Sequence, residues 1–244
     1  MKIIGITGPT GAGKTTALSA LSGLGGYLID CDAVYHRLLD CSAPMCSELT
    51  ARFGWSILDA KGRLDRKRLG EIVFHDAEAL SDLNAITHRY VGEEVDRQLA
   101  AAQAEGRTAA AIDAIALIES GLSGKCDAVV GILAPAEVRV RRIMAREGIA
   151  EAYARARVEA QKEESYFRAH CTYILENGAD DTPETFRARA EKLFLQFLEN
   201  GVQPSAPRSQ TASNIKEESS HGRKAKNRRR AAAGDPALQQ EERL

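Results

Sequence analysis

The chain has 244 residues, 44% of them hydrophobic, and a formal net charge of -1. This length can bury the core of one domain with an appendage, and the charge gives no overall bias towards a polyanionic partner. No apolar run approaches the roughly 18 residues of a membrane-spanning helix, and the apolar start of the chain is too short for a signal peptide. The five cysteines form no CxxC pair, which favours reduced thiols in a cytoplasmic protein over a zinc site.

The predicted elements follow an alternation of short apolar runs with longer amphipathic stretches, which is typical of an α/β protein with a parallel sheet. The five predicted strands are 2–7, 27–30, 108–113, 128–133 and 172–175. The predicted helices are 14–24, one capped by Asp65, one capped by Ser81, 136–146, 151–164, and a last one from Thr182-Pro183 to about 199.

The stretch between the second and third strands is too long for a plain crossover. It predicts a helical insertion at about 33–104, placed where such folds often receive a substrate.

The composition changes after residue 200. Residues 201–244 carry 9 Lys and Arg against 5 Asp and Glu, and they include no aromatic side chain. Such a segment cannot bury enough apolar surface to offset its ordering entropy, so we predict a domain over 1–200 and a disordered basic tail over 201–244. The cluster at 221–230 could attract nucleic acid or an anionic membrane, but it has no aromatic residues for base stacking. We therefore expect no membrane partner and confine any nucleic-acid contact to the tail.

The strongest motif is the G-x-x-x-x-G-K-[ST] sequence from Gly8 to Thr15, between an apolar strand and an amphipathic helix. Its glycines let successive N–H groups converge on phosphate oxygens, at the positive end of a helix. Lys14 would contact the β- and γ-phosphates, and the Thr15 hydroxyl would ligate Mg²⁺. The motif predicts a nucleoside triphosphate site formed by Gly8, Gly11, Ala12, Gly13, Lys14, Thr15 and Thr16.

A phosphate loop alone does not name a reaction. GTPases need an N-K-x-D segment, which this sequence lacks, and Asp59-Ala60-Lys61-Gly62 matches D-x-x-G only within a polar turn. Motors usually need a longer chain with an oligomeric surface. The sequence therefore favours a small phosphotransferase, with a P-loop protein that binds nucleic acid through its tail as the alternative from another class.

A phosphotransferase needs a carboxylate beside the acceptor hydroxyl. Asp30 and Asp32 follow the second strand at its carboxyl end, beside the phosphate loop. On an extended chain both carboxylates would point the same way; the alternative is that one caps the next helix and the other is solvated. Asp113 ends the third strand, where it could hold Mg²⁺ through water or cap a helix.

Four further residues have two interpretations each. Arg142 and Arg146 are one helical turn apart and could both face the nucleotide, or could lie on a solvated, arginine-rich helix face. His88 could contact an acceptor phosphate or pack in a helix. Glu119 could orient the acceptor or lie solvated in a turn.

The phosphate loop, the segment Asp30-Cys31-Asp32 and the later motifs together resemble the dephospho-coenzyme A kinase family over about residues 1–198. The later matching segments are 53–54, 64–69, 83–88, 113–122, 142–146, 157–161 and 177–178. Three positions depart from the family pattern, with Ile115 and Arg89 in place of prolines and Cys171-Thr172 in place of an Ala-Asp pair.

The resemblance implies a three-layer P-loop fold with a parallel five-stranded sheet, an acceptor-binding insertion and a lid at about 146–161. It implies Mg²⁺-dependent transfer of the ATP γ-phosphate to the ribose 3′-hydroxyl of dephospho-coenzyme A, the last step of coenzyme A synthesis. Another P-loop nucleoside or nucleotide kinase is the second choice, and a monomer or weak homo-oligomer is expected.

The resemblance also distributes roles among the candidate residues. It makes Asp32 the base, and it adds Asn177 to the ATP-binding residues. The implied catalytic residues are Asp32, Lys14, Arg142 and Arg146; the implied metal-binding residues are Thr15 and Asp113; the implied acceptor-binding residues are Asp32, His88 and Glu119.

Overall fold

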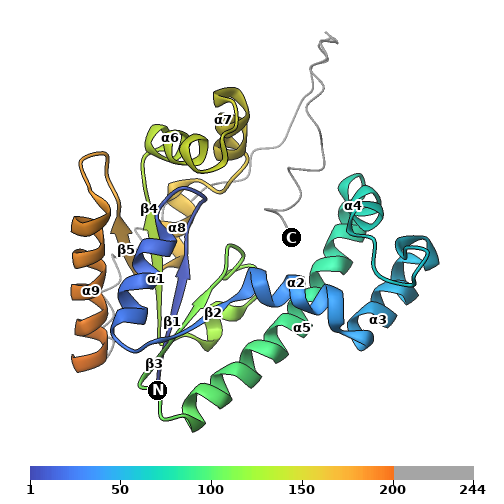
Figure 1. Cartoon of the computed structure of the whole chain (residues 1–244), viewed down its shortest axis with the longest axis horizontal. Coiled ribbons are helices and arrows are strands. Elements are labelled where there is room, and N and C mark those ends of the chain that lie inside the picture. Colours follow the sequence, from blue (N-terminus) through green and yellow to red (C-terminus); the bar gives the residue numbers. More distant parts are fainter. Residues whose placement is uncertain (201–244) are drawn as a thin grey trace, which may run out of the picture.

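Five parallel strands form one sheet in a computed structural model that describes residues 1–200 (Figure 1). In the order β2-β3-β1-β4-β5, the strands are β2 (Tyr27–Asp30), β3 (Ala109–Asp113), β1 (Lys2–Thr7), β4 (Ala128–Leu133) and β5 (Tyr173–Glu176). All four neighbouring pairs are parallel. The predicted strands and fold class are thus confirmed, with ends that differ by at most one residue. The predicted tail at 201–244 lies outside the described residues.

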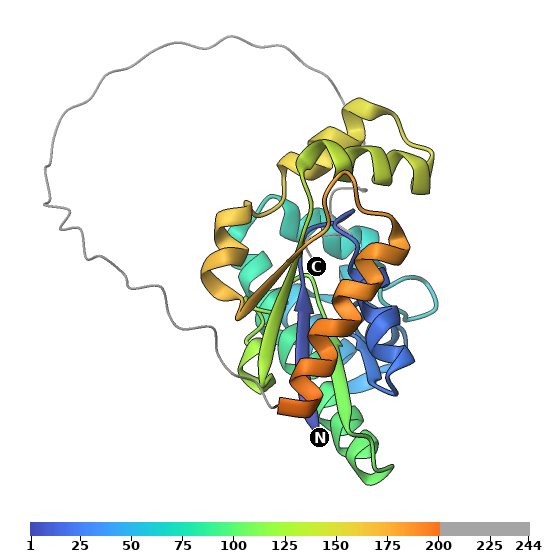
Figure 2. The ribbon, with the colours of Figure 1, turned by 90° about the vertical axis from the view of Figure 1, so that its left-hand side faces the viewer.

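Helices cover both faces of the sheet and produce three layers (Figures 1 and 2). Along β3, Ala109 and Ala111 face the core under α1 (Lys14–Gly23) and α9 (Pro183–Asn200). Ala110 and Ile112 face the opposite core, under the helices of the insertion. The period-two alternation of strand side chains explains why β3 is apolar throughout: neither of its faces meets water.

The stretch after β2 is helical, as predicted. It contains α2 (Cys31–Cys41), α3 (Ala43–Phe53), the 3₁₀ turn η1 (Trp55–Ile57), α4 (Arg66–Phe74) and α5 (Ala77–Ala104). Asp65 caps α4 as expected, accepting hydrogen bonds from the N–H groups of Lys67 and Arg68 at 3.1 and 3.2 Å.

The predicted start of α5 at Ser81 is wrong. Asp76 caps this helix instead, accepting from the N–H groups of Glu78 and Ala79 at 2.9 and 3.1 Å. A carboxylate is at least as good an N-cap as a serine hydroxyl, and Asp76 is the first of the two along the chain. Ser81 therefore lies inside the helix.

The segment that includes the predicted lid at about 146–161 lies at the carboxyl end of the sheet (Figure 1). It consists of α6 (Ala136–Glu147) and α7 (Glu151–Glu159), which share an apolar cluster of their own. The predicted helix 151–164 is wrong at its end: α7 stops at Glu159, and α8 (Glu164–His170) begins after a break. Gln161 lies in that break, where its side chain hydrogen-bonds to the phosphate loop rather than to solvent.

The start of α9 agrees with the sequence. Thr182 precedes α9, and its hydroxyl accepts from the Thr185 N–H at 3.2 Å. A short 3₁₀ turn, η2 (Leu122–Lys125), precedes β4. All five cysteines are free, and no helix within residues 1–200 is long and apolar enough to cross a membrane.

Candidate functional site

The phosphate loop leaves the carboxyl end of β1, between β3 and β4, where the strand order reverses direction. Such a reversal opens a crevice that binds ligands in parallel α/β sheets. Two glycines are required by close packing here. A Cβ on Gly8 would lie 2.2 Å from the Ile132 carbonyl oxygen, and a Cβ on Gly13 would lie 2.3 Å from Asn177 Nδ2. Both also have positive φ, 142° and 108°.

Side chains hold the loop's carbonyl groups from outside. Arg139 Nε donates to the Thr10 carbonyl at 2.9 Å, Arg142 Nη1 to the Gly11 carbonyl at 3.3 Å, and Asn177 Nδ2 to the Ala12 carbonyl at 2.8 Å. No peptide bond within residues 1–200 is cis, so each following N–H points the opposite way. The N–H groups of residues 11 and 13 therefore point away from these supporting side chains, which is the orientation that binding of an anion by the loop requires. Lys14 Nζ lies across the loop, 3.0 Å from the Gly8 carbonyl oxygen.

Asn177 lies beneath the loop. It is 5% exposed, and its Oδ1 accepts from Arg142 Nη2 at 3.0 Å while its Nδ2 supports Ala12. Its own N–H donates to the Leu133 carbonyl at 2.7 Å, which anchors it at the end of β4. In this arrangement Asn177 shapes the loop from behind, and burial lowers the pKa of its partner Arg142.

The two lid arginines have different surroundings. Arg142 contacts the loop and Asn177. Arg146, one turn later, is an exposed side chain paired with Glu147, which also accepts from Arg157. The structure therefore brings only Arg142 of the two to the loop, because the neighbouring Glu147 competes for Arg146.

Three carboxylates gather beside Lys14. Asp30 pairs in register with Asp113 across β2 and β3, and Asp32 follows one residue after the start of α2. The expectation of an extended chain through Asp30 and Asp32 is wrong, because helix α2 begins at Cys31. Asp30 caps this helix, accepting from the Ala33 N–H at 2.9 Å, and Asp32 is an exposed residue of its first turn.

Asp113 is the buried member of this group. Burial raises its pKa to about 6, Lys14 opposes that rise, and Asp30 and Asp32 add to it. Its Oδ1 is buried and has no hydrogen-bond partner within the part of the chain that the structure describes. This orphaned carboxylate oxygen, on a residue that interacts with Lys14, is a ligand of the type that a hard divalent cation binds. Thr15 follows Lys14 in sequence and is exposed at the start of α1.

A second cluster lies under α8. His88 of α5 is half-buried; burial lowers its pKa, and the nearby Glu119 acts in the opposite direction. Burial, together with a hydrogen bond to Glu119, raises the pKa of Tyr166 to about 12. Glu119 thus interacts with both His88 and Tyr166, so the structure brings together two of the three residues that the sequence analysis assigned to acceptor binding, His88 and Glu119.

Sequence reasoning missed the roles of Arg139 and Gln161. Arg139 is 7% exposed and donates to both Thr10 and Gln161. Its spacing of three and seven residues from Arg142 and Arg146 was the available signal, since these positions share one helix face. Gln161 contacts Thr10 across 151 residues of sequence, and no local pattern indicates such a contact.

Each of the three departures from the family pattern makes a local contact, through the side chain at Arg89 and Thr172 and through the backbone at Ile115. Arg89 pairs with Glu48 of α3 and stacks 4.6 Å from the Tyr90 ring, which ties α5 to α3. The Thr172 hydroxyl accepts from the Val129 N–H at 3.1 Å. The Ile115 carbonyl accepts from the Thr7 hydroxyl at 3.2 Å.

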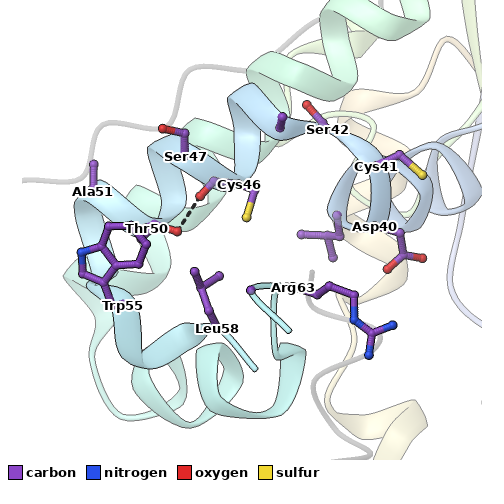
Figure 3. Close-up of a pocket in the computed structure, with 13 residues that line it drawn as sticks. Asp40, Cys41, Ser42, Cys46, Ser47, Thr50, Ala51, Trp55, Leu58 and Arg63 are labelled. Atoms are coloured by element: carbon purple, nitrogen blue, oxygen red, sulfur yellow. Dashed lines mark hydrogen bonds between the residues drawn. The ribbon is translucent and has the colours of Figure 1, made fainter. Parts of the chain in front are cut away.

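A groove of about 560 Å³ lies in the insertion, at the opposite end of α2 from Asp32 (Figure 3). The side chains of Cys46, Thr50 and Leu58 line it, and Trp55, 81% exposed, stands at its edge. This groove does not include the phosphate loop or the carboxylates around Lys14.

Comparisons with known proteins place this site in context. A family model described as dephospho-CoA kinase matches residues 2–182. The chain is 39% identical to a dephospho-CoA kinase of Moorella thermoacetica over 210 residues, which is 85% of this chain and 99% of that protein. It is 36% identical to a dephospho-CoA kinase of Thermobifida fusca, covering 80% of this chain and 95% of that protein.

Solved structures give the same result. The crystal structure of TT1252 from Thermus thermophilus is 33% identical, covers 80% of this chain and 96% of that one, and superposes with a TM-score of 0.67. A dephospho-CoA kinase from Campylobacter jejuni is 26% identical, covers 83% of this chain and all of that one, and has a TM-score of 0.61.

Proposed function

Because the chain belongs to the dephospho-CoA kinase family, we propose that it transfers the γ-phosphate of ATP to the ribose 3′-hydroxyl of dephospho-CoA. The product is coenzyme A, and the reaction is the last step of its synthesis. The observation that carries this proposal is the gathering of a complete phosphate loop, Lys14 and the exposed Asp32 at one end of the sheet. A site for the phosphate donor thus lies beside a carboxylate that can accept a hydrogen bond from the acceptor hydroxyl.

The loop and Lys14 perform the phosphate part of the reaction. N–H groups that are fixed by carbonyl contacts behind them need no rearrangement when charge develops on the transferred group. Lys14 supplies a point charge to the same oxygens. Arg142, held against the loop by Asn177, adds a second cation at the lid side, and Arg146 would join it after release from Glu147.

Asp32 orients or deprotonates the acceptor hydroxyl. Asp32 is exposed in the first turn of α2, where a substrate can reach it, and Asp30 caps the same helix. His88 and Glu119 bind other parts of the acceptor, within a cluster that also includes Tyr166. The insertion at about 33–104 therefore serves as the acceptor-binding part of the protein.

Asp113 and the Thr15 hydroxyl are the residues that would hold Mg²⁺. Their oxygen atoms are the ligand type that a hard divalent cation prefers, and Asp113 Oδ1, which has no hydrogen-bond partner among the described residues, can coordinate the ion. When bound, the ion neutralises charge on the phosphate oxygens of ATP. The five free cysteines suit a reducing compartment such as the cytoplasm.

A coupled assay of ADP release tests the proposal. Dephospho-CoA should stimulate turnover strongly, whereas AMP and uridine, acceptors for a nucleotide or nucleoside kinase, should not. Equal stimulation by all three would remove the acceptor assignment.

The role of Asp32 has its own test. Asp32→Asn should lower kcat by about 10²–10⁴-fold, the usual contribution of a general base, and should leave ADP affinity nearly unchanged. Asp96→Asn, at an exposed aspartate of α5 paired with Lys125, is the control and should retain wild-type turnover. Wild-type kcat in Asp32→Asn would exclude it as the base.

A further inference from the structure

Thr10 of the phosphate loop is hydrogen-bonded to two residues of the lid segment, Arg139 and Gln161. Its N–H donates to Gln161 Oε1 at 3.1 Å, its hydroxyl accepts from Gln161 Nε2 at 2.9 Å, and its carbonyl accepts from Arg139 Nε at 2.9 Å. Arg139 Nη2 also donates to Gln161 Oε1, so each of the three residues is hydrogen-bonded to the other two. With Thr10 only 7% exposed, these contacts are shielded from water.

The two lid residues of this set lie at the two ends of the lid. Arg139 is in the first turns of α6, and Gln161 follows the end of α7. Between them, Val140 and Ile143 pack with Ala154 and Val158 in one apolar cluster, which joins α6 and α7 into one body. Both ends of this body therefore rest on a single residue of the phosphate loop.

The peptide unit between Thr10 and Gly11 connects the lid contact at Arg139 with the phosphate-binding side of the loop. Its carbonyl accepts from Arg139, and because the peptide bond is trans, its N–H, on Gly11, points away from Arg139 and can bind a phosphate oxygen. Because a peptide unit is a rigid plane, a phosphate oxygen bound to that N–H fixes the direction in which the carbonyl faces Arg139. Nucleotide binding and lid position are thus linked through one peptide plane.

We propose that Thr10, Arg139 and Gln161 couple nucleotide binding to closure of the α6–α7 lid, with Gln161 and Thr10 as positioning residues. Closure excludes water and leaves the acceptor hydroxyl as the only nucleophile near the γ-phosphate. Without the coupling, ATP still binds to the loop, but the lid is not recruited and the γ-phosphate passes to water. This inference builds on the proposed kinase activity, yet the coupling itself can be measured with nucleotide alone.

The test compares Gln161→Ala and Thr10→Val with the conservative variants Gln161→Glu and Thr10→Ser. Glutamate still accepts from the Thr10 N–H and Arg139, and serine keeps the hydroxyl that valine removes. Gln196→Ala, at an exposed glutamine of α9, is the matched control. Thermal unfolding of each variant verifies that it is folded, and the Thr10 variants carry the test if a Gln161 variant does not fold.

The first readout is hydrogen exchange of residues 140–160 with and without ADP. In wild type, Gln196→Ala and the two conservative variants, ADP should slow exchange in this region; in Gln161→Ala and Thr10→Val the slowing should be lost, with ADP still bound. Wild-type protection in both of these variants would overturn the proposal. Because no acceptor is present, this result does not depend on the assignment of the substrate.

The second readout is the ratio of ATP hydrolysis to phosphate transfer. Gln161→Ala and Thr10→Val should lower kcat about 10- to 100-fold, the effect of a small misplacement at a reacting centre, and should raise the hydrolysed fraction several-fold. The kcat of the double variant should be no lower than that of the more impaired single variant, because both substitutions break the same set of contacts. Additive losses, or a change in ATP KM without any in kcat, would contradict a positioning role.

Discussion

The carboxylate of Asp113 weakens the fold in which it lies, and its removal should stabilise the protein. Burial raises its pKa from the ordinary 3.8 to about 6, so the folded protein holds this proton more tightly than the unfolded chain does. The free energy of unfolding therefore falls as pH rises from about 4 to about 6, and it stays reduced above that range. Asparagine has nearly the same shape and no charge to bury, so Asp113→Asn should remove this decrease in the free energy of unfolding.

The size of the effect follows from the two pKa values. The difference between 3.8 and about 6 amounts to about 3 kcal/mol at neutral pH, because a tenfold change in proton affinity is about 1.4 kcal/mol. At pH 5 the folded carboxyl is still mostly protonated, and the same linkage gives about 1.5 kcal/mol. The advantage of Asp113→Asn over wild type should therefore roughly double between pH 5 and pH 7.5.

Urea unfolding of both proteins at pH 5 and pH 7.5, with a chelator and without nucleotide, measures this difference. The kinase activity of Asp113→Asn should fall, because the ligand proposed for Mg²⁺ is lost. A more stable but less active variant is expected where burial of a charge serves function. If Asp113→Asn were less stable than wild type, or if its advantage did not grow with pH, the account of this carboxylate would be refuted.

Three further predictions concern the loop and the acceptor cluster. Gly13→Ala places a Cβ 2.3 Å from Asn177 Nδ2 and should weaken ADP binding at least about 100-fold in a fluorescence titration; unchanged affinity would contradict the packing argument. Asn177→Asp loses the donor to the Ala12 carbonyl and should raise the ATP KM about tenfold in steady-state kinetics, with the acceptor KM as an unaffected internal control. His88→Asn should raise the KM for dephospho-CoA about tenfold and leave that for ATP unchanged; equal effects on both would remove it from the acceptor site.

Much of the fold was accessible from the sequence because its determinants are local. Each strand is an apolar run bounded by turns. The phosphate loop is a motif whose glycines indicate its backbone geometry. Gly8 and Gly13 are glycines because a side chain would collide with Ile132 and Asn177. The motif implies this requirement even before the colliding groups are known.

The first residue of a helix depended on which of the neighbouring polar side chains capped it. Asp30 ends a strand, but its side chain also caps the next turn, so α2 starts at Cys31 and separates Asp30 from Asp32 in orientation. Asp76 precedes Ser81 and starts α5 earlier than the sequence analysis expected. Both outcomes are competitions between neighbouring polar side chains, which residue patterns describe only approximately.

The support of the loop was not accessible, because it arises from contacts between distant segments. Asn177 was assigned to ATP, yet it holds the Ala12 carbonyl across 165 residues. Arg139 and Gln161 converge on Thr10 only after α6 and α7 have folded back over the loop. Arg146, which spacing placed beside Arg142, pairs instead with the adjacent Glu147. Sequence spacing predicts which face of a helix a side chain lies on, whereas the residue that it contacts there depends on the tertiary fold.

The central claim is that this site transfers phosphate to one particular hydroxyl. Incubation of the enzyme with ATP, Mg²⁺ and dephospho-CoA, followed by phosphorus–proton correlation NMR of the product, identifies the phosphorylated atom directly. The account predicts a new phosphomonoester coupled to the ribose 3′ proton, formed in proportion to ADP and nearly absent with Asp32→Asn. Phosphate found on another hydroxyl, or ADP released only with inorganic phosphate, would contradict it.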